Sequence, residues 1–436
     1  MISYKNKIFP IKIEKLVYQG WGLGKVGNIV VFVPRLIPGD IAHIKLIQKK
    51  SRFFMGECLS LIQPSKFRAN INSCSHFQEC GGCQLIDLKY EDQLPLMQDI
   101  INDSIKQFIP SETFLIKPII GSESNYYYRN KMEFSFGKNE SGITLGLKKR
   151  KTYDQIINIK NCKLQTEDTN LILYYTRNFF NSKQMSVWDS KQLNGCLRYL
   201  MIRHSKYKNE FMLNLVVGEY YVDIFEEYYQ YLRTYIKNIS SFYVTLQNTR
   251  SDTAFSENIS HISGNKMLTE KLGNKLFNIS PLSFFQTNSK QATILYDQVA
   301  NAIKDEKCNL LLDLYCGTGT IGIYLSDYCS KVIGIEENPS SILDAKINAS
   351  NNAISNIEFY EGRVKNILKF NMFNPDCIIV DPPRCGMVPK ALKRMVAQNA
   401  NTIIYVSCNP VTLMRDLKEI LTYDYYIDYI QPIDMF

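Results

Sequence analysis

The sequence predicts an α/β protein whose C-terminal part, residues 281–436, is a doubly wound parallel sheet. An OB-like β-barrel over residues 1–62 and a central α+β region over residues 63–280, with strands at 126–137 and 211–218, are expected to precede it. Residues 425–431 are expected to form one strand of the parallel sheet. Three observations support this reading: short strands between turns at the N-terminus, a cysteine cluster after them, and alternating apolar and helical patterns after residue 281. The 436 residues are 45% apolar and 21% charged, which excludes large disordered regions and coiled coils.

The N-terminal barrel is expected to be basic and dotted with aromatic side chains. Residues 1–68 hold twelve Lys or Arg and three Asp or Glu, an excess of nine that equals the net charge of the whole chain, +9. Such a module binds polyanions or simply presents a solvated basic face, and charge alone leaves both open. Four aromatic residues either stack on bases or belong to the core: Trp21, Phe32, Phe53 and Phe54. Strands are expected at 12–18, 29–34, 41–48 and 53–62, with a glycine-rich turn at 20–27.

The cysteines suggest a reducing compartment and a metal site. Twelve cysteines in a chain without a signal peptide do not resemble a disulfide framework. The sequence contains no run of 18 apolar residues, so no membrane span is predicted. We therefore expect a cytoplasmic protein. Cys74, Cys80 and Cys83 form a C-x5-C-G-G-C motif, and Cys162 is a candidate fourth ligand. Four cysteines hold Zn²⁺ or a [4Fe–4S] cluster, and reduced core thiols are the alternative.

A cofactor site is expected after the strand at 309–314. Gly317 and Gly319 form a turn between this strand and a helix, but their spacing is not the dinucleotide fingerprint. Asp313 would repel a pyrophosphate. Glu336 ends the next strand, 23 residues after Asp313, where an acidic side chain commonly accepts from ribose hydroxyls. Together these residues predict S-adenosylmethionine binding, although tight packing of the turn and a solvated glutamate are the alternatives.

A reactive site is expected at the ends of two later strands. The strand at 377–381 ends in Asp381-Pro382-Pro383-Arg384, and the strand at 403–407 leads to Cys408. Because parallel strands share their carboxyl edge, Asp381 and Cys408 are expected to be neighbours. Asp381 suits the N–H edge of a base, and Cys408 is the candidate nucleophile rather than an inert buried thiol. Cys316 and Cys385 lie in loops at the same edge and are weaker candidates because neither ends a strand.

The motifs resemble those of the TRAM-domain, iron–sulfur-containing RNA (uracil-5-)-methyltransferases, and the 23S rRNA enzymes are the best match. The resemblance covers nearly the whole chain through the barrel, C-x5-C-G-G-C, Y-R-N-K (128–131), C-x-L-Q (162–165), F-F-Q-x-N (284–288), D-L-Y-C-G-T-G-T-I-G (313–322), I-E-x-N-P (335–339), D-P-P-R and V-S-C-N-P (406–410). It implies that the barrel grips RNA. It also implies a [4Fe–4S] cluster on Cys74, Cys80, Cys83 and Cys162, S-adenosylmethionine contacts from Gln286, Tyr315, Glu336 and Asp381, and Cys408 as the nucleophile. The related tRNA enzymes generally lack the barrel and the cluster, so rRNA is the expected substrate.

The implied chemistry needs a thiolate, groups that hold the pyrimidine, and a base. Addition of a thiolate to uracil C6 makes C5 nucleophilic enough to take the methyl group, and a base must then remove the C5 proton. A target in paired or stacked RNA must also be extruded. Relatives continue beyond D-M-F (434–436) to a His-x-Glu whose glutamate is thought to be the base, whereas this chain ends at Phe436. We therefore expect no base from that segment, a missing last strand and slow release of Cys408.

Three other functions remain as alternatives, and a fourth is disfavoured. A cytosine-5 methyltransferase uses the same thiolate addition, but D-P-P-R matches the uracil class better. A tRNA uracil-5 methyltransferase and a catalytically impaired RNA-binding protein are further alternatives. Asp313 and the glycine spacing disfavour a hydride-transferring Rossmann enzyme. No membrane or protein partner is predicted.

Overall fold

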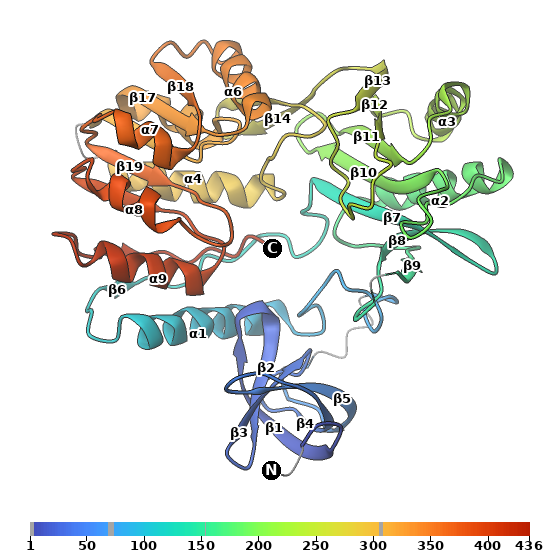
Figure 1. Ribbon diagram of the computed structural model, residues 1–436, viewed down its shortest axis with the longest axis horizontal. Helices are drawn as coiled ribbons and strands as arrows, with labels where there is room; N and C mark the ends of the chain where they lie inside the picture. Colours follow the sequence, from blue (N-terminus) through green and yellow to red (C-terminus); the bar gives the residue numbers. More distant parts are fainter. Residues whose placement is uncertain (1–3, 69–73, 153, 305–307) are drawn as a thin grey trace. The chain divides into compact units, whose positions relative to one another are not determined.

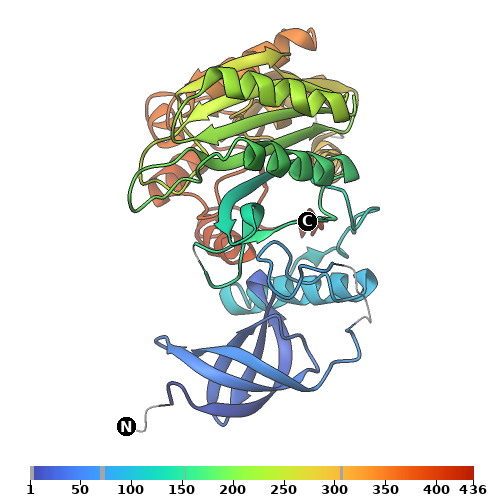
Figure 2. The ribbon, with the colours of Figure 1, turned by 90° about the vertical axis from the view of Figure 1, so that its right-hand side faces the viewer.

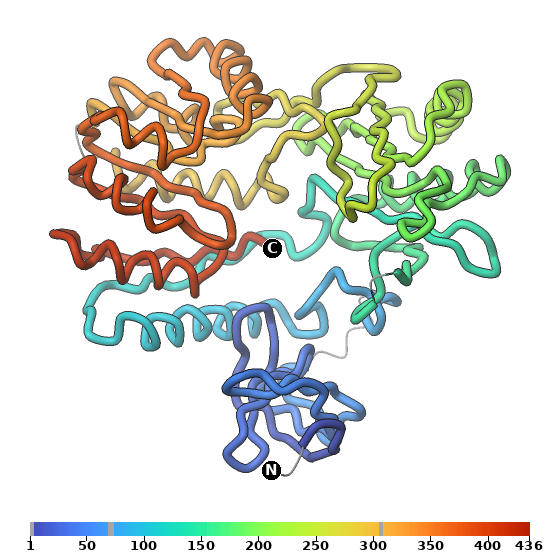
Figure 3. Tube along the Cα trace, in the orientation of Figure 1, coloured from blue at the N-terminus to red at the C-terminus, as the bar shows by residue number. Residues whose placement is uncertain are grey.

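The computed structural model describes residues 4–68, 74–152, 154–304 and 308–436 of the protein. The chain divides into two compact units, and each is described by itself. The first unit comprises Met1–Phe77, Gly82–Gly121 and Asn409–Asp434, and the second comprises Gln78–Gly81, Ser122–Cys408 and Met435–Phe436. Figure 3 traces the path of the chain through both units. The three-part division at residues 62 and 280 stays a prediction.

The first unit begins with a closed five-stranded barrel in the order β1-β2-β3-β5-β4. The predicted barrel is therefore confirmed, and it is drawn in blue in Figure 1. Its core consists of alternate side chains of the strands, among them Ile11, Ile13, Val31 and Val33. The strands are β1 (Ile8–Val17), β2 (Trp21–Val26), β3 (Ile29–Pro34), β4 (Ile41–Lys49) and β5 (Phe54–Gln63).

The middle of the glycine-rich segment of the barrel is a strand rather than part of a turn. β2 contains Gly22 and Gly24, whereas Gly20 lies in a short 3-10 turn before it and Gly27 in the turn after it. A Cβ atom on Gly22 would lie 2.3 Å from the carbonyl oxygen of Leu36, and one on Gly24 would lie 2.4 Å from that of Lys12. These glycines therefore allow the chain to pass close to neighbouring backbone, a role that their composition did not reveal.

The four aromatic residues of the barrel do not share one environment. Phe54 is buried in the core, so the proposal that it stacks on bases is wrong. Phe32 and Phe53 are half-buried and pack edge to face, with ring centroids 4.7 Å apart. Trp21 is half-buried at the start of β2.

The remainder of the first unit pairs segments that are far apart in the sequence. Ile105 and Ile109, at the end of α1 (Tyr90–Phe108), pack against Met414 of α9 (Pro410–Ile420). β6 (Leu115–Ile116) pairs in parallel with β21 (Tyr429–Ile430). The sequence predicted residues 425–431 as a strand of the C-terminal parallel sheet. That prediction is wrong, because local apolarity marks a strand but does not specify its partner.

The second unit contains a mixed seven-stranded sheet in the order β13-β12-β11-β10-β7-β8-β9. Two helices, α2 (Glu167–Ser182) and α3 (Val222–Tyr235), lie side by side on one face of this sheet (Figure 2). The strand predicted at 211–218 is present, whereas the one predicted at 126–137 begins only at Lys131. The strands are β7 (Lys131–Asn139), β8 (Gly142–Lys148), β9 (Ile156–Asn158), β10 (Leu197–Ser205), β11 (Glu210–Val217), β12 (Ile239–Leu246) and β13 (Ile259–Gly264).

A hairpin of β14 (Leu268–Leu272) and β15 (Lys275–Ile279) leads to a five-stranded parallel sheet in the order β18-β17-β16-β19-β20. The first strand in sequence lies at the centre and the chain winds outward in both directions, so the predicted doubly wound fold is confirmed. The strands are β16 (Cys308–Leu314), β17 (Cys329–Glu336), β18 (Ile357–Glu361), β19 (Cys377–Val380) and β20 (Thr402–Tyr405). The helices are α4 (Ser289–Ile303), α5 (Thr320–Leu325), α6 (Pro339–Asn351), α7 (Val364–Phe370) and α8 (Pro389–Val396).

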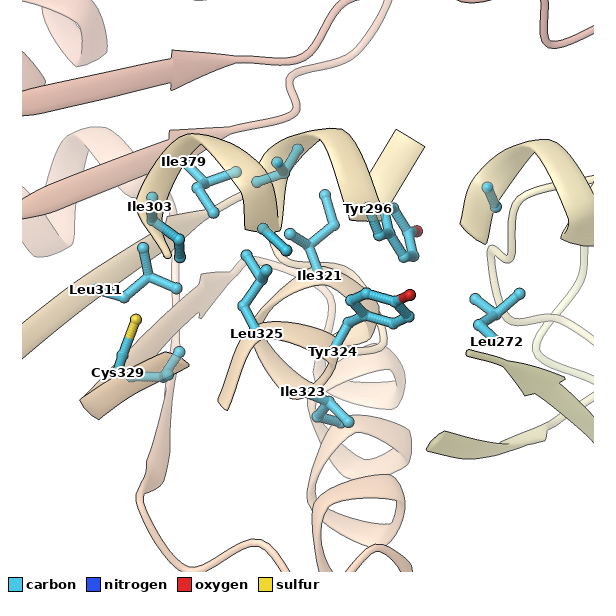
Figure 4. Close-up of a cluster of buried hydrophobic side chains, with 14 of the residues drawn as sticks. Leu272, Tyr296, Ile303, Leu311, Ile321, Ile323, Tyr324, Leu325, Cys329 and Ile379 are labelled. Carbon is cyan, nitrogen blue, oxygen red and sulfur yellow. The ribbon is translucent and has the colours of Figure 1, made fainter. Parts of the chain in front are cut away.

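Buried apolar side chains hold α4 and α5 to this sheet. Figure 4 shows Tyr296 of α4 and Ile321 of α5 in the same cluster as Leu311 of β16 and Ile379 of β19. The packing fixes the turn between β16 and α5, since both of its ends are anchored in the core. Within the described residues, no helix combines the length and apolarity that crossing a membrane would require.

Candidate active site

The sequence-predicted residues of the second unit gather at the carboxyl edge of the parallel sheet. Glu336 ends β17, Tyr315 follows β16, Asp381 follows β19, and Cys408 lies three residues beyond β20. The strands are in register there, because Leu314 pairs with both Ile335 and Val380, and Val380 pairs with Tyr405. The sheet reverses its winding between β16 and β19, the place where open α/β sheets bind ligands.

The glycine turn leaves room for a ligand on one side and packs tightly on the other. Gly317 has φ +55°, and a Cβ atom there would meet no atom within 4 Å. Gly319 has φ +73°, and its Cβ atom would lie 3.0 Å from the ring of Phe359. The amide of Gly317 donates to the Glu336 carboxylate over 3.2 Å. This bond joins the turn to the end of β17, so the open space lies beside Glu336.

Acidic groups determine the electrostatics of this edge. Burial raises the pKa of Asp313 to about 8, although the amide of Gly322 donates to its Oδ2 over 2.9 Å and opposes the shift. The charges of Asp381 and Glu336 raise it further. Burial also raises the pKa of Asp381 to about 7. A site lined by carboxyl groups suits a cationic or neutral ligand better than a phosphate.

Exposure separates Cys408 and Cys385 from Cys316 among the candidate nucleophiles. Cys408 is exposed, and the amide of Val406 donates to the carbonyl of Val380 over 2.9 Å, which ties its strand to β19 beyond the end of β20. Cys316 is buried, and burial raises the pKa of its thiol well above the usual value. A thiol held in its protonated form is a poor nucleophile, so Cys316 is not a candidate. Cys385 is exposed in the loop after β19.

Gln286 lies on the segment between β15 and α4, where its side chain is half-buried. The side chain of Asn130 donates to the carbonyl oxygen of Gln286 over 2.8 Å. Arg203 of β10 donates to the carbonyl oxygens of Pro281 and Ser283 in the same segment. Asn130 belongs to the Y-R-N-K motif, whereas Arg203 belongs to none of the sequence motifs. No local pattern identifies either role, because both contacts join residues far apart in the chain.

The predicted four-cysteine site receives no support from the structure. Cys74 and Cys83 are half-buried residues of the first unit, and Cys80 and Cys162 are buried residues of the second. Across the residues that the structure describes, no three His, Cys, Asp or Glu side chains form a group able to hold a metal ion. The cluster therefore stays a prediction from the resemblance.

Comparison with known proteins assigns the chain to a family. Residues 123–434 match the tRNA (Uracil-5-)-methyltransferase family model, and residues 3–59 match that of the TRAM domain. Uncharacterized RNA methyltransferases of Clostridium tetani and Oceanobacillus iheyensis are 35% and 31% identical, and the matches cover 100% and 99% of this chain and 96% and 94% of those proteins.

A solved structure is similar over nearly the whole chain. The crystal structure of a Pyrococcus abyssi tRNA (uracil-54, C5)-methyltransferase in complex with S-adenosyl-L-homocysteine has a TM-score of 0.76 and 27% sequence identity. The match covers 98% of this chain and 96% of that one. The chain is therefore an enzyme of the tRNA (uracil-5-)-methyltransferase family, and a TRAM domain forms its N-terminal barrel.

Proposed function

We propose that this enzyme transfers a methyl group from S-adenosylmethionine to C5 of a uridine in RNA, with Cys408 as the nucleophile. The observation that carries the proposal is the exposed thiol of Cys408 at the carboxyl edge of β20, beside the strand that presents Asp381. The open side of the Gly317 turn and the carboxylate of Glu336 lie on the same edge. The donor and the pyrimidine therefore have places on neighbouring strands.

Each step of the proposed reaction forms or breaks a defined bond. The thiolate of Cys408 adds to C6, which places negative charge on C5 and its neighbouring carbonyl group. C5 then attacks the methyl group, and S-adenosylhomocysteine leaves with the electron pair of the broken carbon–sulfur bond. A base removes the C5 proton, and elimination of the thiolate restores the double bond. We assign no residue to that base.

The cofactor residues have distinct proposed roles. Glu336 accepts from ribose hydroxyls, Tyr315 and Gln286 line the pocket, and Asp381 lies between the donor and the pyrimidine. Tyr315 has φ +63°, a backbone conformation that is unusual for a residue other than glycine and often found at functional sites. The carboxylate of Glu336 beside the Gly317 turn favours the positively charged sulfonium of the methyl donor.

Two RNA molecules are candidate substrates. We propose 23S rRNA as the substrate, from the resemblance of the motifs. A tRNA is the second candidate, because the Pyrococcus abyssi tRNA enzyme is similar over 98% of this chain. That coverage includes the barrel region, so a barrel does not by itself favour rRNA over tRNA.

Labelled S-adenosylmethionine tests the proposal with unmodified 23S rRNA and unmodified tRNA as separate substrates. We expect 5-methyluridine in one of them, with loss of methyl transfer in Cys408→Ala and near-normal transfer in Cys385→Ala, the matched exposed cysteine. Turnover by Cys408→Ala would contradict the assignment of the nucleophile. Tight RNA binding by the wild-type protein without methyl transfer to either RNA would favour the catalytically impaired alternative.

We retain a [4Fe–4S] cluster on Cys74, Cys80, Cys83 and Cys162 as a prediction from the resemblance alone. Iron and acid-labile sulfide analysis of anaerobically purified protein tests it. We expect both to be present in the wild-type protein and in Cys58→Ser, and to be lost in Cys83→Ser. Their absence from the wild-type protein would remove the cluster from the proposal.

A further inference from the structure

The segment Ser280–Ser289 connects the hairpin to α4 and carries Gln286. Its first nine residues form no helix or strand, yet buried polar side chains hold it on both sides of Gln286. Burying a polar side chain costs free energy unless that side chain forms hydrogen bonds. Here the hydrogen-bond partners are backbone carbonyl groups and hydroxyl groups of the segment itself.

Arg203 holds the part of the segment before Gln286. Its side chain is 3% exposed, its Nε donates to the carbonyl oxygen of Pro281 over 3.4 Å, and its Nη2 donates to that of Ser283. Burial lowers the pKa of Arg203 to about 10, so the guanidinium stays charged at neutral pH. Hydrogen bonds from a charged donor are stronger than those from a neutral one, and two of them restrict this stretch of backbone.

Asp344 of α6 holds the same part from the methyltransferase sheet side. Its Oδ2 accepts from the hydroxyl of Ser280 over 2.8 Å and from that of Ser283. Asp344 is itself buried. Ser283 is therefore held at two points, its carbonyl group by Arg203 and its hydroxyl group by Asp344.

Asn130 holds the part that contains Gln286. Its Nδ2 donates to the carbonyl oxygen of Gln286 and to the hydroxyl of Ser289, each over 2.8 Å. Its backbone amide donates to the carbonyl oxygen of Thr287 over 2.7 Å. The Ser289 hydroxyl in turn donates to buried Glu270 over 3.1 Å. The backbone on both sides of the Gln286 side chain is thus fixed by residues outside the segment.

We propose that Arg203 and Asn130 are positioning residues of the cofactor pocket, which act by holding the segment that presents Gln286. They touch the backbone of the segment and not the reacting atoms. Preorganisation of this kind lowers the entropy lost when a ligand binds, so its removal weakens affinity for the cofactor. The inference rests on the proposed function, because it requires that Gln286 contacts the cofactor.

Arg198 provides a matched control on the same strand. It is also a buried arginine of β10, 5% exposed, and it donates to the carbonyl oxygens of Gln247, Thr249 and Ser251 in a different loop. Arg203→Met and Arg198→Met therefore remove similar charged donors from similar depths. Only the first of the two variants releases the segment with Gln286.

The experiment measures the dissociation constant of S-adenosylhomocysteine by calorimetry, the KM for S-adenosylmethionine, kcat and Tm. We expect Arg203→Met to raise the dissociation constant and KM about tenfold with a smaller change in kcat, the loss of about one charged hydrogen bond. Arg198→Met should lower Tm by a similar amount and leave both constants within about twofold. Arg203→Lys should restore part of the affinity because it keeps one donor.

Equal effects of Arg203→Met and Arg198→Met on cofactor affinity would overturn the inference, as would an unchanged affinity in Arg203→Met. If Arg203→Met does not fold, Asn130→Ser serves instead, because it releases the part of the segment that contains Gln286. Its affinity for S-adenosylhomocysteine must then be weaker than that of Arg198→Met. Failure of the wild-type protein to bind S-adenosylhomocysteine would instead contradict the proposed function. The two failures are therefore distinguishable.

Discussion

Asp313 of β16 combines deep burial with a hydrogen bond to Gly322 of α5, on the other side of the glycine turn. Its Oδ2 accepts from the amide of Gly322, while burial raises its pKa to about 8. The folded protein therefore keeps a proton on Asp313 that the unfolded chain releases near pH 4. Because the folded state binds more protons between those two pKa values, this residue makes stability fall as pH rises from about 4 to about 8.

Asp313→Asn tests this linkage. The amide oxygen of asparagine still accepts from Gly322, but asparagine does not ionise. We expect the Tm of the variant to exceed that of the wild-type protein by a margin that widens by about 5 °C between pH 5 and pH 8. Thermal unfolding at intermediate pH values measures the margin. Glu358→Gln, at an exposed ion pair on β18, should show a constant margin, and a constant margin for Asp313→Asn would contradict the linkage.

At the scale of the element, β2 depends on glycines that do not lie in turns. A Cβ atom on Gly24 would come within 2.4 Å of the carbonyl oxygen of Lys12 and 2.9 Å of the side chain of Ile11. The crowding is with backbone of the neighbouring strand, which cannot move without opening the barrel ladder. We infer that glycine is needed here for close approach of strands.

Gly24→Ala should therefore destabilise the barrel by about 3 kcal/mol. Gly27→Ala is the matched control, because Gly27 has φ +57° but a Cβ atom there meets no atom within 4 Å, and its cost should be about 1 kcal/mol. Limited proteolysis of the full chain measures opening of the barrel, and cleavage within residues 8–63 should be faster in Gly24→Ala. Equal protection in the two variants would rule out steric crowding as the role of Gly24.

At the scale of the whole molecule, the charge is concentrated in one part of the chain. The excess of nine positive charges in residues 1–68 equals the net charge of all 436 residues. Lys45 and Lys49 lie on the outer side of β4, and Lys12 lies on the outer side of the adjacent strand β1. An RNA held by such side chains releases bound counterions, so its affinity falls steeply with salt concentration.

Replacement of Lys12, Lys45 and Lys49 by alanine should reduce the slope of log affinity against log salt concentration by about 2. Filter binding of the RNA substrate at several salt concentrations measures that slope. The dissociation constant of S-adenosylhomocysteine should stay the same. Replacement of three exposed lysines of the second unit, Lys191, Lys208 and Lys346, is the charge-matched control. An equal reduction of this slope in both triple variants would show that the barrel lysines contribute no more to RNA binding than other exposed lysines.

Local sequence patterns were enough to predict the strands of the parallel sheet and the residues at or just after their carboxyl ends. Glu336, Asp381 and Cys408 were identified in this way, because parallel βα units bring every strand end to one edge whatever the details of packing. The fold class followed from the same local patterns. These features depend on residues that are close together in the chain.

The three-dimensional structure was needed to show that Cys385 and Cys408 are exposed, which strand pairs with β21, and why β2 contains glycines. It also brought Asn130 and Arg203 to the segment with Gln286, across 156 residues in the first case and 80 between Arg203 and Ser283. Burial and hydrogen-bond partners arise from contacts between such distant residues. Local periodicity carries no information about them, because it reflects only which face of an element is apolar.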